Sequence, residues 1–130
     1  MKLGANVILE STEGITLQLR DDLFLWGIFG GLVKDGEEPR AAAIREVQEE
    51  LTIRLEPRRL SFMKVFEGPQ HTTHLYHYPL AVDELSGAVL TEGIRFETKK
   101  PSSLQSHEVV PWHWQMLKWY WSKGQLQSTG

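Results

Sequence analysis

The chain has 130 residues and a mass of 14.9 kDa, a size typical of one domain, so we predict a single domain over residues 1–130. Its 14 Lys and Arg against 17 Asp and Glu give a net charge of −3, which argues against a general nucleic-acid binder, and the absence of cysteine excludes thiolate nucleophiles and zinc–thiolate clusters. No apolar run approaches the length of a membrane span, so we expect no membrane partner and a cytoplasmic location.

The expected strands are short and separated by turns. β-Branched and alternating apolar residues predict a hairpin from residues 5–10 and 14–20. A short buried strand at 25–29 then runs into the paired Gly30 and Gly31, where irregular backbone is expected. The complete set of predicted strands covers residues 5–10, 14–20, 25–29, 60–66, 73–78 and 94–97. Together with two helices, they predict a mixed α+β domain.

Proline marks the start of both expected helices. Pro39 stands where a first helical residue is favoured, and residues 40–51 are rich in helix formers. Pro111 opens a second, aromatic-rich helix that Gly124 should close, and residues 125–130 should form a frayed tail. Because the second helix is apolar nearly all round, core packing is the leading explanation, with a homodimer interface or base stacking as alternatives.

Three glutamates gather on the first helix. At about 100° per residue, Glu46, Glu49 and Glu50 fall within an arc of about 100°. Like charges three and four residues apart destabilise an isolated helix, so we expect a cation to neutralise them. Mg²⁺ or Mn²⁺ suits this role because hard divalent cations take oxygen ligands. Arg45 can reach Glu49 one turn later and Glu37 in the preceding loop, which would hold both carboxylates in place.

The spacing of these residues resembles the Nudix box, G-x5-E-x7-R-E-U-x-E-E-x-G-U, in which U is apolar. The matched positions are Gly31, Glu37, Arg45, Glu46, Val47, Glu49, Glu50 and Ile53. Thr52 departs from the box, since it stands where the family usually has glycine. Because glycine eases a left-handed helix cap, we expect the substitution to alter the exit turn more than the metal face. The resemblance implies the Nudix fold, an α/β/α sandwich with a mixed β-sheet flanked by helices.

The resemblance also implies a reaction. Nudix enzymes typically hydrolyse nucleoside diphosphates linked to another moiety, with divalent metals and water. Position by position, it makes Glu46, Glu49 and Glu50 metal ligands and Gly30 a ligand through its backbone carbonyl. Glu92 resembles a later acidic position that some members use as ligand or base, and an ordinary surface glutamate is the alternative. The general base stays open, because members differ in whether it lies in the box or on a later loop.

The substrate is expected to be a small nucleotide-like molecule, such as a nucleoside triphosphate, ADP-ribose or a nucleotide sugar. The alternative function is a nucleotide-sensing binding module that retains the metal site with little turnover. Trp26, Tyr76 and His77 are candidates for substrate contacts. In an extended strand His74 and His77 point to opposite faces, so a shared metal site is not expected there. The chain is expected to be a monomer or a homodimer.

Overall fold

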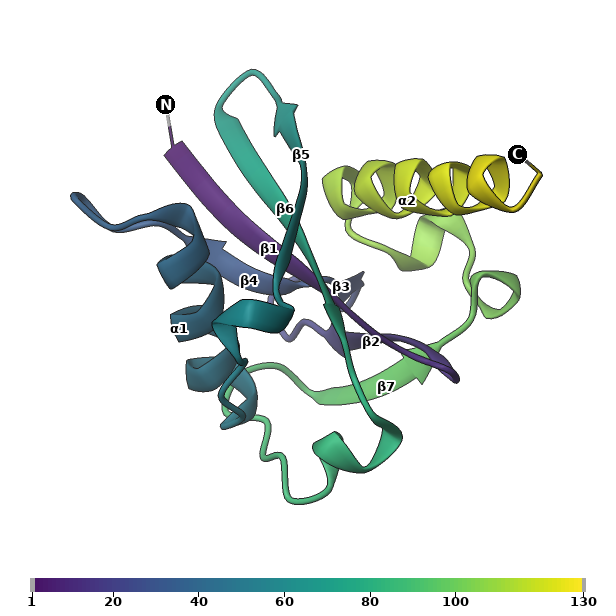
Figure 1. Cartoon of the computed structure of the whole chain (residues 1–130), viewed down its shortest axis with the longest axis horizontal. Helices are drawn as coiled ribbons and strands as arrows, with labels where there is room; N and C mark the ends of the chain where they lie inside the picture. Colours follow the sequence, from purple (N-terminus) through teal and green to yellow (C-terminus); the bar gives the residue numbers. More distant parts are fainter. Residues whose placement is uncertain (1, 130) are drawn as a thin grey trace.

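One mixed sheet of seven strands has an α-helix on each face (Figure 1). The computed structural model describes the backbone of residues 2–129 and the side chains of residues 2–81 and 83–123. The strands are β1 (Lys2–Ser11), β2 (Gly14–Leu19), β3 (Trp26–Gly27), β4 (Phe29–Leu32), β5 (Ser61–Glu67), β6 (His71–Pro79) and β7 (Arg95–Lys99). The helices are α1 (Pro39–Leu51) and α2 (Pro111–Thr129), with short 3-10 turns at Pro57–Arg59, Val82–Leu85, Pro101–Ser103 and Ser106–Glu108. The layers confirm the predicted α/β/α sandwich.

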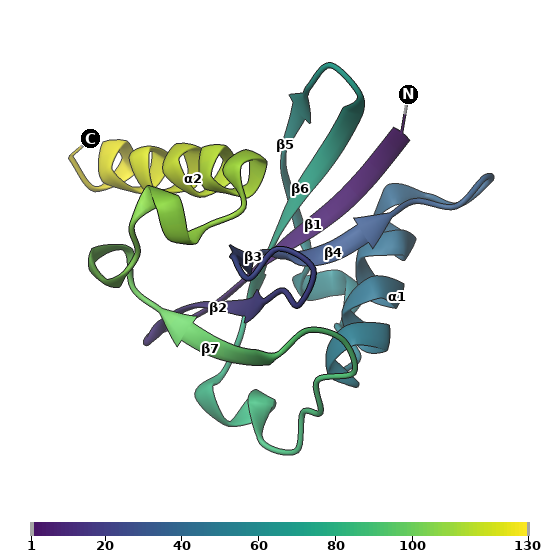
Figure 2. The same ribbon diagram turned by 180° about the vertical axis from the view of Figure 1, so that it is seen from behind.

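The central strand is β1. One of its edges pairs in parallel with β6 over residues 2–10. Its other edge is shared, because β4 pairs with residues 4–7 and β2 with residues 9–11, both antiparallel. The strand β2 also pairs with β3 and β7, while β5 pairs with β6. The view from behind shows β4 beside α1 and β7 beside β2 (Figure 2). The start of the Nudix-like segment therefore lies between the central strand and its helix.

The core consists of two apolar clusters, one on each face of the sheet. Alternation along β1 sends Val7 and Leu9 to the α1 side and Ile8 to the α2 side, and all three are fully buried. Partners on the α1 side include Ala42, Ala43, Val47 and Leu51. Partners on the α2 side include Ile28, Leu75, Met116 and Leu117. Each large apolar side chain contributes about 2 kcal/mol when buried, so both helices are firmly held to the sheet.

The strands predicted at residues 5–10 and 73–78 are longer than expected, and two further sequence-based boundaries are wrong for reasons that the structure shows. The strand predicted at residues 25–29 is divided at Ile28, whose backbone N–H donates to His113 Nδ1 at 2.9 Å and so leaves the strand pairing. The second helix continues to Thr129 and does not end at Gly124, because a glycine inside a helix costs only about 1 kcal/mol. The predicted frayed tail thus falls on this helix, except for residue 130, which lies outside the described residues. Neither helix of the described residues combines the length and the apolar composition that a membrane-spanning helix needs.

Candidate active site

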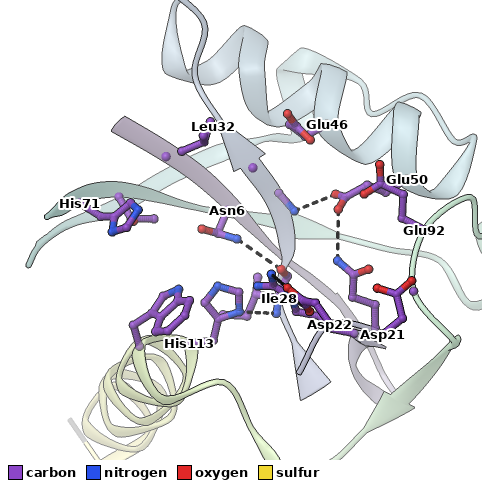
Figure 3. Close-up of a pocket in the computed structure, with 18 residues that line it drawn as sticks. Asn6, Asp21, Asp22, Ile28, Leu32, Glu46, Glu50, His71, Glu92 and His113 are labelled. Atoms are coloured by element: carbon purple, nitrogen blue, oxygen red, sulfur yellow. Dashed lines mark hydrogen bonds and ion pairs between the residues drawn. The ribbon is translucent and has the colours of Figure 1, made fainter. Parts of the chain in front are cut away.

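A cavity of about 550 Å³ opens beside Gly30 and Gly31 of β4. Its walls come from elements that are far apart in the chain, namely β1, β2, β4, β6, α1, the loop after β2, the loop before β7 and the start of α2 (Figure 3). Its acidic residues are Asp21, Asp22, Glu46, Glu50 and Glu92, and its other polar or aromatic residues include Asn6, Gln18, His71, Trp112 and His113. The fold therefore assembles one acidic cavity from both halves of the chain.

The two glycines let an acidic side chain approach the backbone of the sheet. Gly30 has φ +142, and a Cβ atom there would collide with the carbonyl oxygen of Ala5 on β1. A Cβ atom on Gly31 would lie 2.5 Å from the carboxyl carbon of Glu46. The irregular backbone expected at this pair is found only at Gly30, because both glycines lie in strand β4 and pair in register with β1. The absence of a side chain at Gly31 makes room for Glu46 against β4.

Glu50 is the buried acid of the cavity. Its side chain is tied down at both oxygens, since Gly30 N–H donates to Oε1 at 3.0 Å and Gln18 Nε2 donates to Oε2 at 3.2 Å. Burial raises the pKa of Glu50 to about 7, and the charges of Glu46 and Glu92 add to that rise, while the two hydrogen bonds oppose it. The two hydrogen bonds therefore do not fully offset the cost of burying a negative charge on Glu50.

Arg45 forms hydrogen bonds with three other acids, which are Glu37, Glu46 and Glu49. Its guanidinium donates to both oxygens of Glu37, from Nε at 2.8 Å and from Nη2 at 2.9 Å, and Nη2 also reaches the carbonyl of Leu32 at 3.1 Å. The hydrogen bond from Arg45 is the main reason that the pKa of Glu37 falls to about 2. Nη1 donates to Glu46 at 3.0 Å and to Glu49 at 3.2 Å. The expected reach of Arg45 to Glu37 and Glu49 is confirmed.

The structure separates the three glutamates of α1. Glu46 and Glu50 line the cavity, whereas Glu49 is not among its lining residues and its side chain is 55% exposed beside Arg45. Glu92 lines the cavity from the loop before β7, and Figure 3 shows it next to Glu50. Glu92 from the later loop thus lies in the same cavity as Glu46 and Glu50, two of the three helix glutamates.

The oxygen donors of the cavity suit a hard divalent cation. Glu46, Glu50 and Glu92 supply carboxylates, and the raised pKa of Glu50 shows that this position favours an added positive charge. In the described residues, no three His, Cys, Asp or Glu side chains already stand close enough to hold a metal ion. Arg45 contacts only Oε1 of Glu46, so Oε2 of Glu46 is not held by the guanidinium, whereas both oxygens of Glu49 face Arg45 and metal binding by Glu49 would require its carboxylate to turn away.

The cavity also contains residues that sequence reasoning missed. Asn6 is 8% exposed and donates from Nδ2 to the carbonyls of Ile28 and Phe29, each at 3.3 Å. His113 is 5% exposed and accepts from Ile28 N–H, and Trp112 beside it is 55% exposed. The available signal was weak: a lone amide in the apolar run of β1 and a lone histidine in an apolar helix. Their meeting depends on strand pairing and helix docking.

The three candidates for substrate contacts lie elsewhere. Trp26 is buried, with Lys99 Nζ 4.7 Å from its ring centroid. Tyr76 is buried on the α1 side of the sheet. His77 contacts Glu10 at 2.9 Å and stacks on Tyr120 of α2. None of the three is among the residues that line the cavity.

The sequence of the chain matches a known protein family, and its fold superposes on solved structures. A model of the NUDIX domain matches residues 2–126. No curated protein matches the chain. A MutT NUDIX hydrolase from Burkholderia pseudomallei superposes with a TM-score of 0.76 at 19% identity, covering 90% of this chain and 95% of that one. A bifunctional NMN adenylyltransferase/ADP ribose pyrophosphatase from Francisella tularensis, complexed with AMP and a Mn ion, gives 0.77 at 18% identity, covering 94% of this chain and 41% of that one. A MutT protein from Methanosarcina mazei gives 0.70 at 16% identity, covering 95% and 94%.

Proposed function

Because the chain belongs to the NUDIX family and is a Nudix hydrolase, we propose that it uses Mg²⁺ or Mn²⁺ to cleave a diphosphate linkage in a nucleoside diphosphate joined to another moiety. The observation that carries this proposal is the meeting of buried Glu50 with Glu46 and Glu92 in one cavity beside Gly30 and Gly31 of β4. Members of the family act on substrates of this general class. The bifunctional Francisella tularensis protein, of which this chain covers 41%, is complexed with AMP and a Mn ion, which are a nucleotide and a divalent cation of the proposed kinds.

The acidic wall is proposed to hold the cation. Glu46, Glu50 and Glu92 would be its side-chain ligands, with the carbonyl of Gly30 beside them, and Glu49 would join after its carboxylate leaves Arg45. Once bound, the cation would screen the diphosphate charge and acidify water. Gly30 N–H and the Gln18 amide orient Glu50, while the Arg45–Glu37 pair fixes the loop that leads into α1. Water is the proposed nucleophile, and a carboxylate of this wall is the proposed base.

The opposite wall is proposed to bind the nucleoside. Burial lowers the pKa of His113 to about 3, so its imidazole is neutral, and because Nδ1 accepts from Ile28, its proton lies on Nε2 as a donor. Asn6 donates from Nδ2 to two carbonyls, which leaves Oδ1 as an acceptor. The exposed indole of Trp112 adds a stacking surface. A donor, an acceptor and an aromatic face suit a nucleobase better than a purely anionic group.

A substrate panel tests the proposal. Nucleoside triphosphates, ADP-ribose, nucleotide sugars and dinucleoside polyphosphates are incubated with the protein and Mg²⁺ or Mn²⁺, and the products are identified by mass spectrometry. We expect metal-dependent cleavage within the diphosphate of at least one substrate and its loss in Glu50→Gln. Tight nucleotide binding without product at any metal concentration would favour the alternative, a nucleotide-sensing module. The cytoplasmic location and the monomer or homodimer state stay predictions.

A further inference from the structure

The loop that carries Glu92 is docked on the C-terminal end of α1. The last carbonyls of an α-helix lack partners within the helix and must find them elsewhere. Here residues 86–93 supply the donors, because Val89 N–H reaches the carbonyl of Leu51 at 3.1 Å and Thr91 N–H reaches that of Glu50 at 2.9 Å. The same helix end that presents Glu50 to the cavity therefore anchors the loop by its backbone.

Two threonine hydroxyls reinforce this docking. Thr91 Oγ1 donates to the carbonyl of Glu49 at 2.5 Å. Thr52 Oγ1 accepts from Val89 N–H at 3.1 Å and donates to the carbonyl of Leu51 at 2.5 Å. Both hydroxyls thus lie at the junction of α1 and the loop.

Thr52 also occupies the position at which the chain departs from the Nudix box. Its φ of +61 is the left-handed conformation that glycine adopts without strain and a β-branched residue adopts at a cost. A hydroxyl that bonds to the loop is what threonine provides there and glycine cannot. The departure therefore has a local physical consequence beyond the helix cap.

We propose that Thr52 and Thr91 are positioning residues, which hold residues 86–93 on α1 so that the Glu92 carboxylate stays beside Glu50. The inference rests on the proposed function, in which Glu92 is a metal ligand or the base. Glu92 lines the cavity, and Figure 3 shows its side chain next to that of Glu50. Ala88 and Leu90 pack against the α1-side core, so the loop keeps an apolar anchor when a hydroxyl is removed.

The test removes each hydroxyl and keeps a matched control. Thr91→Val retains the shape of threonine without its hydroxyl, and Thr52→Gly removes the hydroxyl while relieving the positive φ. Thr91→Ser and Thr52→Ser keep the hydroxyls. We expect the first two variants to lose about tenfold in kcat, equivalent to one hydrogen bond, and to need more Mg²⁺ for half-maximal rate. The serine variants should stay within about twofold of wild type.

A second background shows whether the threonines act through Glu92. In Glu92→Gln, adding Thr91→Val or Thr52→Gly should cause no further loss of kcat. Full activity in both single variants, or an equal loss in the Glu92→Gln background, would overturn the inference. Calorimetric titration of Mn²⁺ into the same variants gives a readout without turnover: weaker binding that serine restores supports the positioning role, and unchanged binding contradicts it. The proposed function fails separately, if wild type cleaves nothing or Glu50→Gln remains active.

Discussion

The buried carboxyl of Glu50 makes a quantitative prediction for the metal-free protein. Its pKa rises from the ordinary value of 4.5 to about 7, chiefly because burial disfavours the charged form. A carboxyl whose pKa is higher in the folded than in the unfolded state stabilises the fold fully below pH 4.5, and this contribution is lost as pH rises through about 7. At about 1.4 kcal/mol for each pH unit, the loss approaches about 3 kcal/mol.

Glu50→Gln tests this value because glutamine cannot ionise. The free energy of unfolding is measured by urea denaturation at several pH values between 4 and 8 in the presence of a chelator. We expect wild type and variant to be similar at pH 4, where Glu50 is protonated. Towards pH 8 the variant should become more stable than wild type by about 3 kcal/mol. Titrating groups away from the site change both proteins alike, so the difference between them reports Glu50 together with its coupling to Glu46 and Glu92.

Two outcomes would refute this reasoning. A difference between wild type and Glu50→Gln that does not change with pH would mean that Glu50 titrates at its ordinary pKa in the folded protein. If Glu50→Gln became less stable than wild type as pH rises, a partner other than a metal would favour the charged form of Glu50 in wild type. Adding Mg²⁺ at pH 8 should stabilise wild type and leave the variant nearly unchanged, because the proposed cation compensates the Glu50 charge.

Three further substitutions probe the site. Gly31→Ala places a methyl group 2.5 Å from the carboxyl carbon of Glu46, so kcat should fall by about a hundredfold with a small change in Tm. Unchanged kinetics would contradict the proposed role of Glu46. Glu49→Gln should abolish turnover while the free energy of unfolding stays within about 1 kcal/mol, since the side chain is half exposed beside Arg45; full activity in a kinetic assay would remove Glu49 from the proposed ligands. His113→Ala should cost about 3 kcal/mol in urea denaturation, because it opens a cavity and leaves a buried backbone N–H without its acceptor; a cost below about 0.5 kcal/mol would show that the imidazole is not needed there.

Local patterns were sufficient to predict much of the fold. Pro39 begins α1 as expected, and the hairpin formed by β1 and β2 follows the predicted alternation. The sequence predicts one strand at residues 25–29 because nothing in those residues reveals that the N–H of Ile28 bonds to His113, which lies 85 positions later. Boundaries set by neighbouring residues are thus readable in the sequence, and those set by a distant side chain are not.

Local spacing also predicts the two helix glutamates of the site, but it does not predict the other residues that line the cavity. Glu46 and Glu50 lie one turn apart on a helix, so their common orientation follows from helix geometry. Asn6, Gln18 and Trp112 reach the cavity through the pairing of β1 and β2 and through the docking of α2, which no local spacing specifies. A spacing motif therefore locates the proposed metal wall, while the wall proposed to recognise the substrate emerges only from the assembled fold.

The distribution of charge distinguishes Glu50 from the other acids of α1. One guanidinium, that of Arg45, is shared among Glu37, Glu46 and Glu49. Within the described residues, Glu50 takes part in no ion pair and has only the Gly30 N–H and the Gln18 amide as donors. Like charges close together on a helix cost stability, and Arg45 offsets that cost for Glu46 and Glu49 on α1 while it also pairs with Glu37 in the preceding loop. The fourth acid is left buried and uncompensated, and that is where a divalent cation would gain most from binding.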